Sequence, residues 1–578
     1  MKKTIIYLWL LIAGFSLNGC YDLDTYPGDT LSESLFWKTE DHAHQAMMGI
    51  YSTFRSNGNV YNRHFMWDEL GETAYGYDQI AGIPRGTYTA RDGDVSGKWQ
   101  GLYECVQRAN IVITRVSGMS VDASVINQYV AEAKFLRAVA YFELLKFFGG
   151  VPYYDETTNV NVEYADLKKP RSSADEIRAY IIADLKEAIN ALPVSYAASE
   201  YGRATKGAAY ALLGKVYLYN KEWKNAITNF EEIVNNRSNN YGYALDPDYA
   251  HIFKLYNGDK SPEMIFSIQN KSGVGTAYGM PMNFYMGTRN SYGSCWNNTV
   301  PGTQLIDSYE YPDGRPFNWD DIFPGYNAMS VDERKALLCV GYNGSAITLG
   351  DIDTAKILKA YTNRDPRLMA TAIVPYSHYL GWSANAPKDM LFILETTGSA
   401  APNGDSPLGT MRNNNGSWRT YFYRKFVTEA DLDGAISDRA HTPFEFPIIR
   451  YADVLLMLAE AYNEDGQLDN AVTQINKVRA RVNLPGINSG PDYLAATTKE
   501  AVFQRIMKER AWEMTGEGHR FNDLQRWGNA KEVIAANPPV GIYGDQLYTH
   551  PFLDRDYLWP IPGAEIERNP DLTQNPGW

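Results

Sequence analysis

Aromatic side chains clustered with amides and carboxylates are the feature of this sequence that most plainly indicates chemistry. An aromatic ring can stack on the apolar face of a sugar ring, while a neighbouring polar group hydrogen-bonds the hydroxyls. The sequence therefore predicts a binding site for an amphipathic, sugar-like ligand, with Trp296 beside Asn297 as its strongest single element. The candidates are Tyr75, Tyr77 and Asp78 in one loop-rich stretch and Tyr292, Trp296, Asn297, Trp319 and Trp382 in another.

The composition narrows the classes of ligand. The chain has 578 residues, among them 42 Tyr and 13 Trp, and a formal net charge of -14. This charge disfavours nucleic acid and an anionic membrane surface as the main partner, because both would repel the chain at long range. Uncharged or cationic ligands fit the overall charge better.

Motifs for catalysis are scarce. The sequence has no G-x-S-x-G elbow and no H-E-x-x-H helix, and its Gly273-Val274-Gly275 lacks the spacing of a dinucleotide turn. A glycoside hydrolase needs only two carboxylates that meet in space, so that alternative stays open. We expect no enzyme activity, no cofactor and no metal. The loop carboxylates that could form such a pair are Glu69, Glu72, Asp320 and Asp321.

The N-terminus has the pattern of an export signal. Lys2 and Lys3 precede an uncharged run, Ile5 to Leu17, that is too short to span a bilayer as a helix. The run ends in Leu17-Asn18-Gly19-Cys20, which resembles a lipobox, so residues 1–19 are predicted to be removed and Cys20 to carry lipid. An ordinary secretory signal is the alternative. No disulfide framework or zinc site is expected from the other cysteines, Cys105, Cys295 and Cys339.

The longest helical pattern, Glu132 to Tyr154, belongs to the scaffold that must hold these loops. Apolar residues cover most of its circumference and leave two thin polar stripes, which predicts an inner helix packed on both sides. We expect Gly149 and Gly150 to end it, because glycine adopts a left-handed cap at least cost. Trp99 and Trp512 also lie in helical patterns and should be core residues.

A repeat pattern appears twice. Tyr210, Leu213, Gly214, Tyr217, Ala226 and Phe230 match tetratricopeptide positions, and Leu458, Ala459, Tyr462, Ala471 and Ile475 match them again more than two hundred residues later. Since one such repeat is about 34 residues long, a large insertion must separate the two helix pairs. That insertion, residues 241–445, is rich in Gly, Asn, Pro and Tyr, and we expect it to carry the ligand face.

The chain ends in a proline-rich tail. Pro560, Pro562, Pro570 and Pro576 predict an extended segment that wraps the surface without a helix, with Trp559 and Trp578 docked into the protein. Before the tail, residues 509–528 combine arginines with carboxylates at helical spacing. We interpret them as a salt-bridged helix end rather than a catalytic acid pair.

Taken in order, these motifs resemble the SusD/RagB family of outer-membrane, glycan-binding lipoproteins. The motifs that carry the resemblance are the lipobox at Cys20, EAKFLRAVAYFELLKFFGGVPYY, NRDPRL at 363–368, FPIIRYADVLLMLAEAYNE, ERAWEMTGEGHRFNDLQRWG and YLWPIPGAEIERNPDLTQNPGW.

The resemblance implies a mainly α fold, with tetratricopeptide-like helix pairs supporting a loop-rich face. It implies a single domain over residues 20–578, whose N-terminal helical part (20–240), loop-rich insertion (241–445) and C-terminal helical part with its tail (446–578) follow in order. It also implies a surface-exposed, lipid-anchored protein that passes oligosaccharide to a SusC-like TonB-dependent barrel. A tetratricopeptide scaffold that binds a peptide or a partner protein is the alternative from another class.

Overall fold

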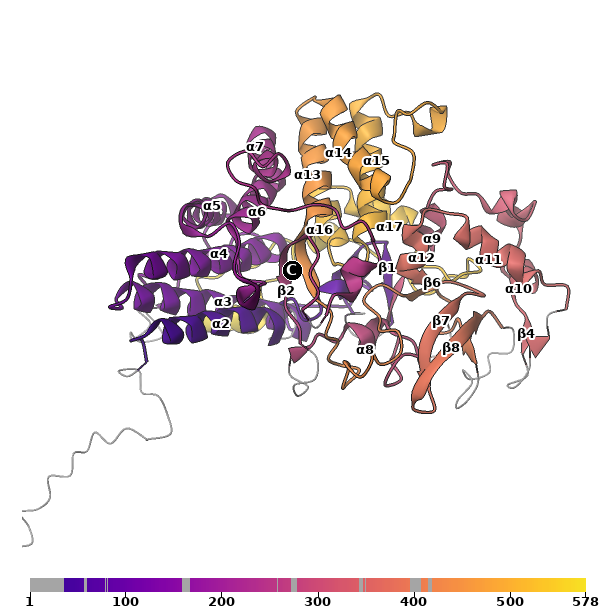
Figure 1. Cartoon of the computed structure of the whole chain (residues 1–578), viewed down its shortest axis with the longest axis horizontal. Helices are drawn as coiled ribbons and strands as arrows, with labels where there is room; N and C mark the ends of the chain where they lie inside the picture. Colours follow the sequence, from indigo (N-terminus) through magenta and orange to yellow (C-terminus); the bar gives the residue numbers. More distant parts are fainter. Residues whose placement is uncertain are drawn as a thin grey trace, which may run out of the picture.

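The fold is that of a helix-rich protein with little sheet (Figure 1). This computed structural model describes residues 36–56, 60–77, 80, 82–158, 167–256, 258–271, 278–342, 347–348, 350–395, 407–413 and 418–578. Cys20, the signal segment and Asp78 lie outside these residues. Within them, every helix is too short or too polar to cross a bilayer. The predicted mainly α class is confirmed.

The N-terminal part is a row of helices that ends in a helix pair, coloured indigo to purple in Figure 1. Neighbours in sequence pack against each other along this row. Its members are α2 (Glu40–Ser56), α3 (Gly93–Ser117), α4 (Ala123–Phe148), α5 (Ala174–Ala191), α6 (Lys206–Tyr219) and α7 (Trp223–Val234), with the 3-10 helices η1 (His64–Leu70) and η3 (Ala198–Glu200) between them.

Helix α4 is the inner helix that its two polar stripes predict. On one side Glu132 accepts from Arg203 Nε at 3.0 Å. On the other side Arg137 Nη2 binds the Asp184 carboxylate at 2.7 Å. Both stripes are therefore neutralised by neighbouring segments. Gly149 follows the last turn with φ +72° and ψ -138°, so the predicted glycine stop is confirmed, although its conformation is not that of a left-handed helical cap.

The two predicted repeat pairs are present and lie together in space. The first is α6 with α7, and the second is α13 (Tyr451–Glu464) with α14 (Leu468–Arg481). Gly214 allows the close approach within the first pair, because a Cβ there would lie 2.6 Å from the Phe230 ring. Helix α13 packs against both α6 and α7, and the Tyr462 hydroxyl donates to Glu231. The insertion thus interrupts the sequence but not the helical stack.

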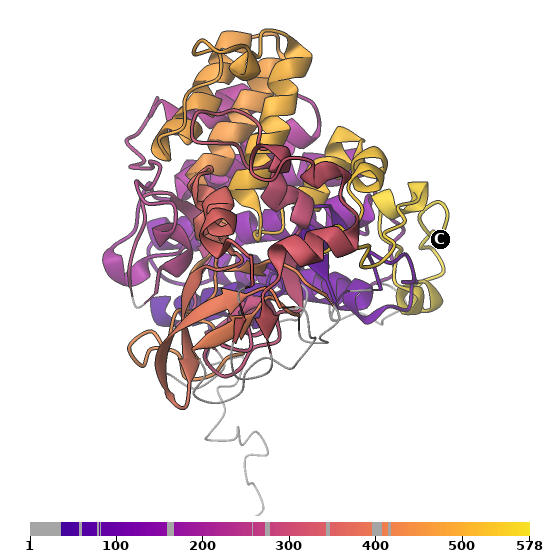
Figure 2. The ribbon, with the colours of Figure 1, turned by 90° about the vertical axis from the view of Figure 1, so that its right-hand side faces the viewer.

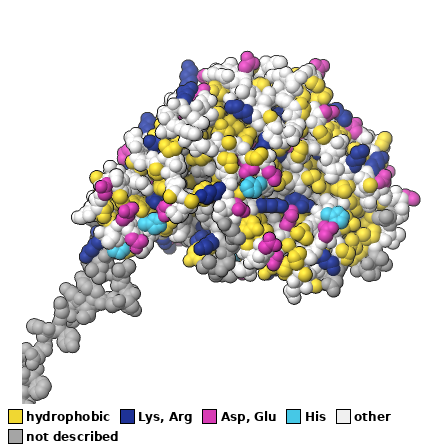
Figure 3. Space-filling model, in the orientation of Figure 1, with side chains coloured by type: hydrophobic (Ala, Val, Ile, Leu, Met, Phe, Trp, Pro, Cys, Tyr) yellow, Lys and Arg dark blue, Asp and Glu magenta, His cyan; other side chains and the backbone are white. Residues whose placement is uncertain are grey.

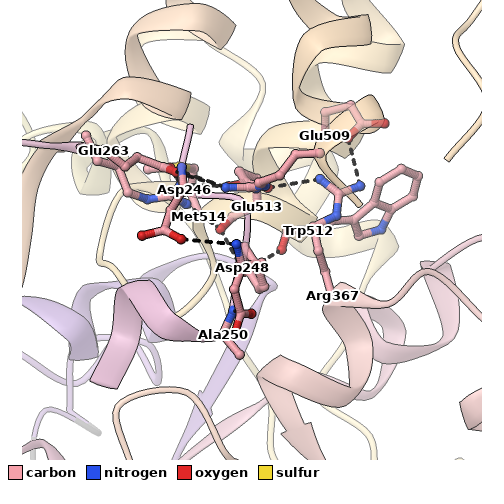
Figure 4. Close-up of polar contacts among 12 residues, drawn as sticks. Asp246, Asp248, Ala250, Glu263, Arg367, Glu509, Trp512, Glu513 and Met514 are labelled. Carbon is pink, nitrogen blue, oxygen red and sulfur yellow. Dashed lines mark hydrogen bonds and ion pairs between the residues drawn. The ribbon is translucent and has the colours of Figure 1, made fainter. Parts of the chain in front are cut away.

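Helix α15 (Lys499–Met514) packs beside α13 and α14 and presents buried acids to buried arginines (Figure 4). Arg367 binds Glu509 at 2.9 Å and Glu513 at 3.1 Å. Arg450 binds Glu513 at 2.6 Å and Glu517 at 2.8 Å. Burial alone would raise the pKa of Glu513, but Arg481, Arg450 and Arg367 hold it well below its usual range. The salt-bridged interpretation of residues 509–528 is confirmed.

Short strands tie the insertion to the scaffold. β2 (Met264–Ile268) pairs antiparallel with β11 (Phe446–Arg450), so the insertion leaves and rejoins the scaffold at neighbouring strands. Within it, β7 (His378–Ser383) and β8 (Ala386–Ile393) form a hairpin that β9 (Leu408–Thr410) extends in parallel. The other pairs are β1 (Ala74–Gly76) with β3 (Thr299–Pro301), β4 (Gly341–Tyr342) with β5 (Ile347–Thr348), and β6 (Ala372–Ile373) with β10 (Phe422–Tyr423).

Short helices complete the insertion, which is more ordered than its composition predicts. Figure 2 faces this part of the molecule. Its helices are α8 (Met282–Met286), α9 (Thr303–Ser308), α10 (Val331–Leu338), α11 (Thr354–Thr362) and α12 (Arg367–Thr371), and its 3-10 helices are η4 (His251–Lys254), η6 (Trp319–Asp321) and η7 (Tyr326–Ala328).

The C-terminal segment corrects one prediction. A short helix, α18, begins directly after Pro562, because proline at the start of a helix removes no hydrogen bond that the helix needs. Trp559 is 1% exposed, and the Trp578 ring lies 4.7 Å from that of Tyr88, so both tryptophans dock as predicted. The remaining elements are η8 (Asp492–Leu494), α16 (Arg520–Trp527), α17 (Ala530–Ala536), η9 (Asp554–Tyr557) and α18 (Gly563–Arg568).

Candidate functional site

The pairing of β1 with β3 joins the two loop stretches that the sequence singles out. Gly76 lies opposite Thr299, and the main-chain N–H of Tyr77 donates to the Asn298 carbonyl at 2.9 Å. Segment 283–300, which follows the start of α8, therefore runs beside the stretch that holds Tyr77. Figure 1 shows α8, β1, β7 and β8 in the right-hand half of the molecule.

A first aromatic group forms where segment 283–300 meets β1. Tyr77 lies edge-on to Trp418, with 5.4 Å between ring centroids. Trp418 in turn stacks on Tyr548 at 5.6 Å and 21°. The guanidinium of Arg85 lies 4.9 Å from the centre of the Tyr548 ring. We call Tyr77, Trp418, Tyr548 and Arg85 the strand group. Tyr77 and Tyr548 are half-buried, so each keeps an exposed part.

A second aromatic group lies further along the same segment. Tyr292 and Trp382 meet edge-on at 5.1 Å, and Trp296 packs against Phe284 at 4.5 Å. The main-chain N–H of Trp382 donates to the Asn290 carbonyl at 2.7 Å, which attaches the β7–β8 hairpin to segment 283–300. We call Tyr292, Trp296, Trp382 and Phe284 the hairpin group. All four rings are half-buried.

Burial removes three of the predicted ligand residues from the exposed surface. Tyr75 is 1% exposed, because its position in β1 turns its hydroxyl toward Gln304. Asn297 is also 1% exposed and donates to the Arg412 carbonyl at 3.0 Å. Trp319 is 6% exposed. These positions do not fit the prediction that their side chains meet a ligand, whereas Tyr77, Tyr292, Trp296 and Trp382 keep exposed parts.

Trp319 lies apart from both groups, although Asn318 and Asp320 flank it in sequence. Its ring stacks on Tyr326 at 4.9 Å and its Nε1 donates to Asp307 at 3.2 Å. The neighbouring Asn318 side chain instead caps the short helix η6. A tryptophan next to polar residues was thus an unreliable sign of exposure, because the polar neighbours serve a turn.

The carboxylates left open for catalysis are engaged in structural contacts. Glu72 binds Arg520, and Asp321 binds Arg315 at 2.8 Å. Glu69 accepts a hydrogen bond from the Thr299 hydroxyl at 2.6 Å beneath the β1–β3 pair. Burial raises the pKa of Glu69 to about 8, so this carboxyl is mostly protonated at neutral pH.

Gly76 has a specific role beside Glu69. A Cβ at this position would lie 1.6 Å from Glu69 Oε2, so no larger residue fits there without moving the acid. Two amide atoms near the strand group, Asn297 Oδ1 and Asn413 Nδ2, are buried and have no hydrogen-bond partner among the described residues. Such atoms gain most from a ligand or water that bonds them.

Four further residues belong to the site, although no sequence signal selects them: Trp418, Tyr548, Arg85 and Arg439. Tyr548 reaches the site from the segment after α17, far along the chain from Trp418. Nothing in its neighbourhood distinguishes it from the many other tyrosines. A turn around Trp418 could have been suspected from its glycine- and asparagine-rich surroundings.

A large hollow lies elsewhere, on the scaffold. It has a volume of about 710 Å³ and lies between α3, the segment after α4 and the C-terminal tail, lined by residues that include Tyr103, Tyr154 and Glu565. None of the strand or hairpin group lines it. Its acids serve ion pairs, as Glu156 does with Arg137 and Glu565 with Arg568. In the described part of the chain, no cluster of His, Cys, Asp and Glu is suited to a metal ion.

Comparisons with known proteins agree over the whole chain. The profile of the SusD family matches residues 262–578. A second profile, described as starch-binding and associating with the outer membrane, matches residues 28–218. Among curated proteins, SusD-like protein P2 of Formosa agariphila is 26% identical over 599 residues. The match covers the full length of both proteins.

Two further relatives extend the likeness. The starch-binding protein SusD of Bacteroides thetaiotaomicron is 24% identical, over 82% of this chain and 76% of that protein. A solved SusD-like carbohydrate-binding protein from Bacteroides fragilis superposes with a TM-score of 0.72 at 25% identity, over 93% of this chain and 100% of that one. Since the SusD profile alone spans more than half of the chain and the fold agrees throughout, the chain belongs to the SusD family.

Proposed function

We propose that this protein captures oligosaccharide at the cell surface and delivers it to a SusC-like TonB-dependent transporter, without catalysing a reaction. The observation that carries the proposal is the joining of two half-buried aromatic groups along segment 283–300, in a chain of the SusD family. The names of its relatives support it, because one binds starch and another binds carbohydrate. Residues 20–578 would act as a single domain.

Binding would rest on ring stacking with hydrogen bonds beside it. Tyr77, Tyr292, Trp296 and Trp382 offer partly exposed faces or edges, and Asp78 remains a proposed partner for sugar hydroxyls. Aromatic platforms of this kind are tolerant of sequence and linkage, because every pyranose has an apolar face. The presence of two aromatic groups along one segment favours an oligosaccharide over a single sugar.

The test is affinity electrophoresis and calorimetry with a panel of neutral and acidic polysaccharides. Wild-type protein should bind at least one of them, and Trp382→Ala should weaken that binding. Tyr180→Ala is a matched control, since Tyr180 is an exposed tyrosine on α5, outside both groups. Failure of every glycan at millimolar concentration, together with binding of a peptide, would favour the tetratricopeptide scaffold instead.

Anchoring and delivery need separate experiments. Cys20→Ser should release the protein into the soluble fraction, because Cys20 is the proposed lipid site and the chain beyond it has no membrane-spanning helix among the described residues. Co-purification of the wild-type protein with a barrel transporter would support delivery. A glycan that is cleaved on incubation with the pure protein would contradict the non-catalytic assignment.

A further inference from the structure

Arginines lie beside both aromatic groups, although the chain as a whole is acidic. The chain carries a net charge of -14, which disfavours anionic partners at long range. Yet arginines accompany both aromatic groups: Arg85 in the strand group, Arg439 in the hairpin group, and Arg412 and Arg289 close to them. Recognition at the site depends on these near charges, since distant ones are screened within about 10 Å at 0.1 M salt.

Arg439 is fixed over the hairpin group. Its guanidinium lies 4.7 Å from the centre of the Phe284 ring and 5.8 Å from that of Trp296. Its Nη1 donates to the carbonyls of Gly293 and Ser294, at 2.9 and 2.6 Å. Those bonds leave Nε and Nη2 for another acceptor. Among the described residues Arg439 forms no ion pair with a carboxylate, so its charge is held in place but not neutralised.

Arg85, in the strand group, is also held over an aromatic ring without an ion pair among the described residues. It lies over Tyr548 at 4.9 Å, and its Nη2 makes only long contacts, 3.4 and 3.3 Å, with the carbonyls of Gly76 and Tyr77. Glu69 lies near enough for the charge of Arg85 to act on it, but the raised pKa of about 8 leaves Glu69 mostly uncharged at neutral pH. In the described chain Arg85, too, forms no ion pair.

The neighbouring arginines add to this positive charge. Burial and the charge of Arg439 lower the pKa of Arg289, and burial and the charge of Arg419 lower that of Arg412. Burial is the larger cause of each lowering, and the neighbouring guanidinium adds to it.

The carboxylates near the two aromatic groups already have hydrogen-bond or ion-pair partners within the protein. Asp389 pairs with His378 at 2.8 Å, and Glu395 pairs with Arg419 at 3.0 Å. Asp438 accepts the main-chain N–H of Ala440 at 2.6 Å. Arg85 and Arg439 themselves form no ion pair with these acids in the described part of the chain.

We propose that the ligand is an anionic glycan, one that bears carboxylate or sulfate groups, and that Arg85 and Arg439 bind those groups while the adjacent rings stack on its sugars. A guanidinium over an aromatic ring presents a planar fork that matches the oxygens of either group. This proposal rests on the proposed function, which is glycan binding, and specifies the chemical class of the glycan.

The test uses matched pairs of polysaccharides that differ only in charge. Polygalacturonate and alginate form the uronate arm, each beside its carboxyl-reduced form. Carrageenan and chondroitin sulfate form the sulfate arm, each beside its desulfated form. Affinities are measured by calorimetry at low and high NaCl for the wild type, Arg85→Gln, Arg439→Gln and Arg439→Lys. Arg91→Gln is the control, because Arg91 is exposed and remote from both groups.

The expected result is that the acidic member of at least one pair binds about tenfold tighter than its neutral form, and that salt removes this advantage. Each Gln variant should lose about tenfold for the acidic member and little for the neutral one, as expected when one charge-assisted hydrogen bond is lost. Arg439→Lys should keep part of the preference, and Arg91→Gln all of it. The two arms tell carboxylate from sulfate.

Equal or weaker binding of the acidic members would overturn the inference while leaving glycan binding intact. So would Gln variants that keep the full preference and fold normally by circular dichroism. If no acidic or neutral glycan binds in either panel, the proposed function fails as well, and the two failures are thus distinguishable.

Discussion

The ring of Trp382 lies edge-on to the ring of Tyr292, with 5.1 Å between their centroids, although Trp382 belongs to β7 and Tyr292 to segment 283–300. The contact is set by the main chain, since the N–H of Trp382 bonds the Asn290 carbonyl two residues before Tyr292. Figure 3 shows hydrophobic side chains at the surface in the region of β7 and β8. Both rings are half-buried, so the pair is a preformed platform that keeps an exposed part.

Removing this platform should cost binding but not stability. Trp382→Ala is expected to weaken glycan binding by about 1–3 kcal/mol, by analogy with stacked nucleic-acid bases. Its Tm should change little, because Trp382 is only half-buried. Calorimetry and thermal melts on the same sample check both. A large fall in Tm with unchanged affinity would show that the ring only holds the hairpin in place.

Trp296 should show a mixed effect. It packs against Phe284 at 4.5 Å and keeps an exposed part, so Trp296→Ala should lower both the affinity and the Tm. Trp296→Phe retains most of the contact area and should recover the Tm more fully than the affinity. If Trp296→Ala binds glycan normally and melts lower, Trp296 is a packing residue and leaves the proposed site.

Trp512 should behave in the opposite way. It is 1% exposed, and its Nε1 donates to the Ser308 hydroxyl at 2.8 Å. Trp512→Ala should therefore destabilise the protein by roughly 3–5 kcal/mol, as for a buried aromatic residue. Denaturant unfolding gives this value directly. The folded fraction should still bind glycan with unchanged affinity, because Trp512 lies in the core rather than in either aromatic group.

Removing one member of the buried arginine–carboxylate network should lower the free energy of unfolding, because it leaves buried charges without a full set of partners. Arg450→Met removes the partner of Glu513 and Glu517 in a site with no exposure, and should cost about 3–5 kcal/mol. Adding Glu513→Gln to Arg450→Met should recover part of that loss, because the other partners of Glu513, Arg367 and Arg481, keep Glu509 and Glu263. Urea unfolding of the single and double variants tests this. A double variant as unstable as the single one would show that packing, not charge, is what Arg450 supplies.

The two buried histidines should each reduce the stability of the folded protein in mild acid. Burial lowers the pKa of both His64 and His519 well below the usual value, so the folded protein holds them neutral. The unfolded chain binds protons at these histidines below about pH 6.5, and stability is therefore lost as the pH falls through that value. His64 faces Glu143, Lys98, Lys146 and Lys215, three of which are cations that oppose its protonation.

The measurement is the free energy of unfolding at pH 8.0, 6.5 and 5.0. The raised pKa values of the buried Glu69, Asp68 and Asp307 act in the opposite direction over this range, so the histidine effect is measured as a difference between variants. The wild type should lose stability relative to His519→Gln between the last two values, because one titrating group is absent from the variant. The buried acids Glu143 and Asp453 have lowered pKa values and destabilise the protein only at more acidic pH. A difference between the wild type and His519→Gln that stays constant from pH 8.0 to 5.0 would contradict the histidine assignment.

The scaffold was predictable because its signals are local and periodic. The two polar stripes of α4 required partners on both sides, and Glu132 and Arg137 have them. The repeat positions placed Gly214 against Phe230 from spacing alone. Helix periodicity records burial directly, so these predictions needed no knowledge of the rest of the chain.

The site was predictable only in part, because pairing between distant segments decides it. Tyr75 and Tyr77 are two residues apart and look alike in sequence, yet pairing with β3 buries Tyr75 and leaves Tyr77 partly exposed. Tyr548 arrives from another part of the chain and could not be selected among so many tyrosines. The local composition of the sequence indicated that a binding site exists, whereas the tertiary fold decides which residues form it.

The pairing of β2 with β11 also bears on how this protein can change over generations. Ile268 and Phe446 are hydrogen-bonded neighbours, so the segment between them begins and ends at one fixed point of the helical stack. Insertions, deletions or wholesale replacement of that segment need not alter the distance its ends must span. Changes in the length of its outer loops should therefore be tolerated, whereas exchange of the whole segment must keep Arg367, which pairs with Glu509 and Glu513 of the helical stack.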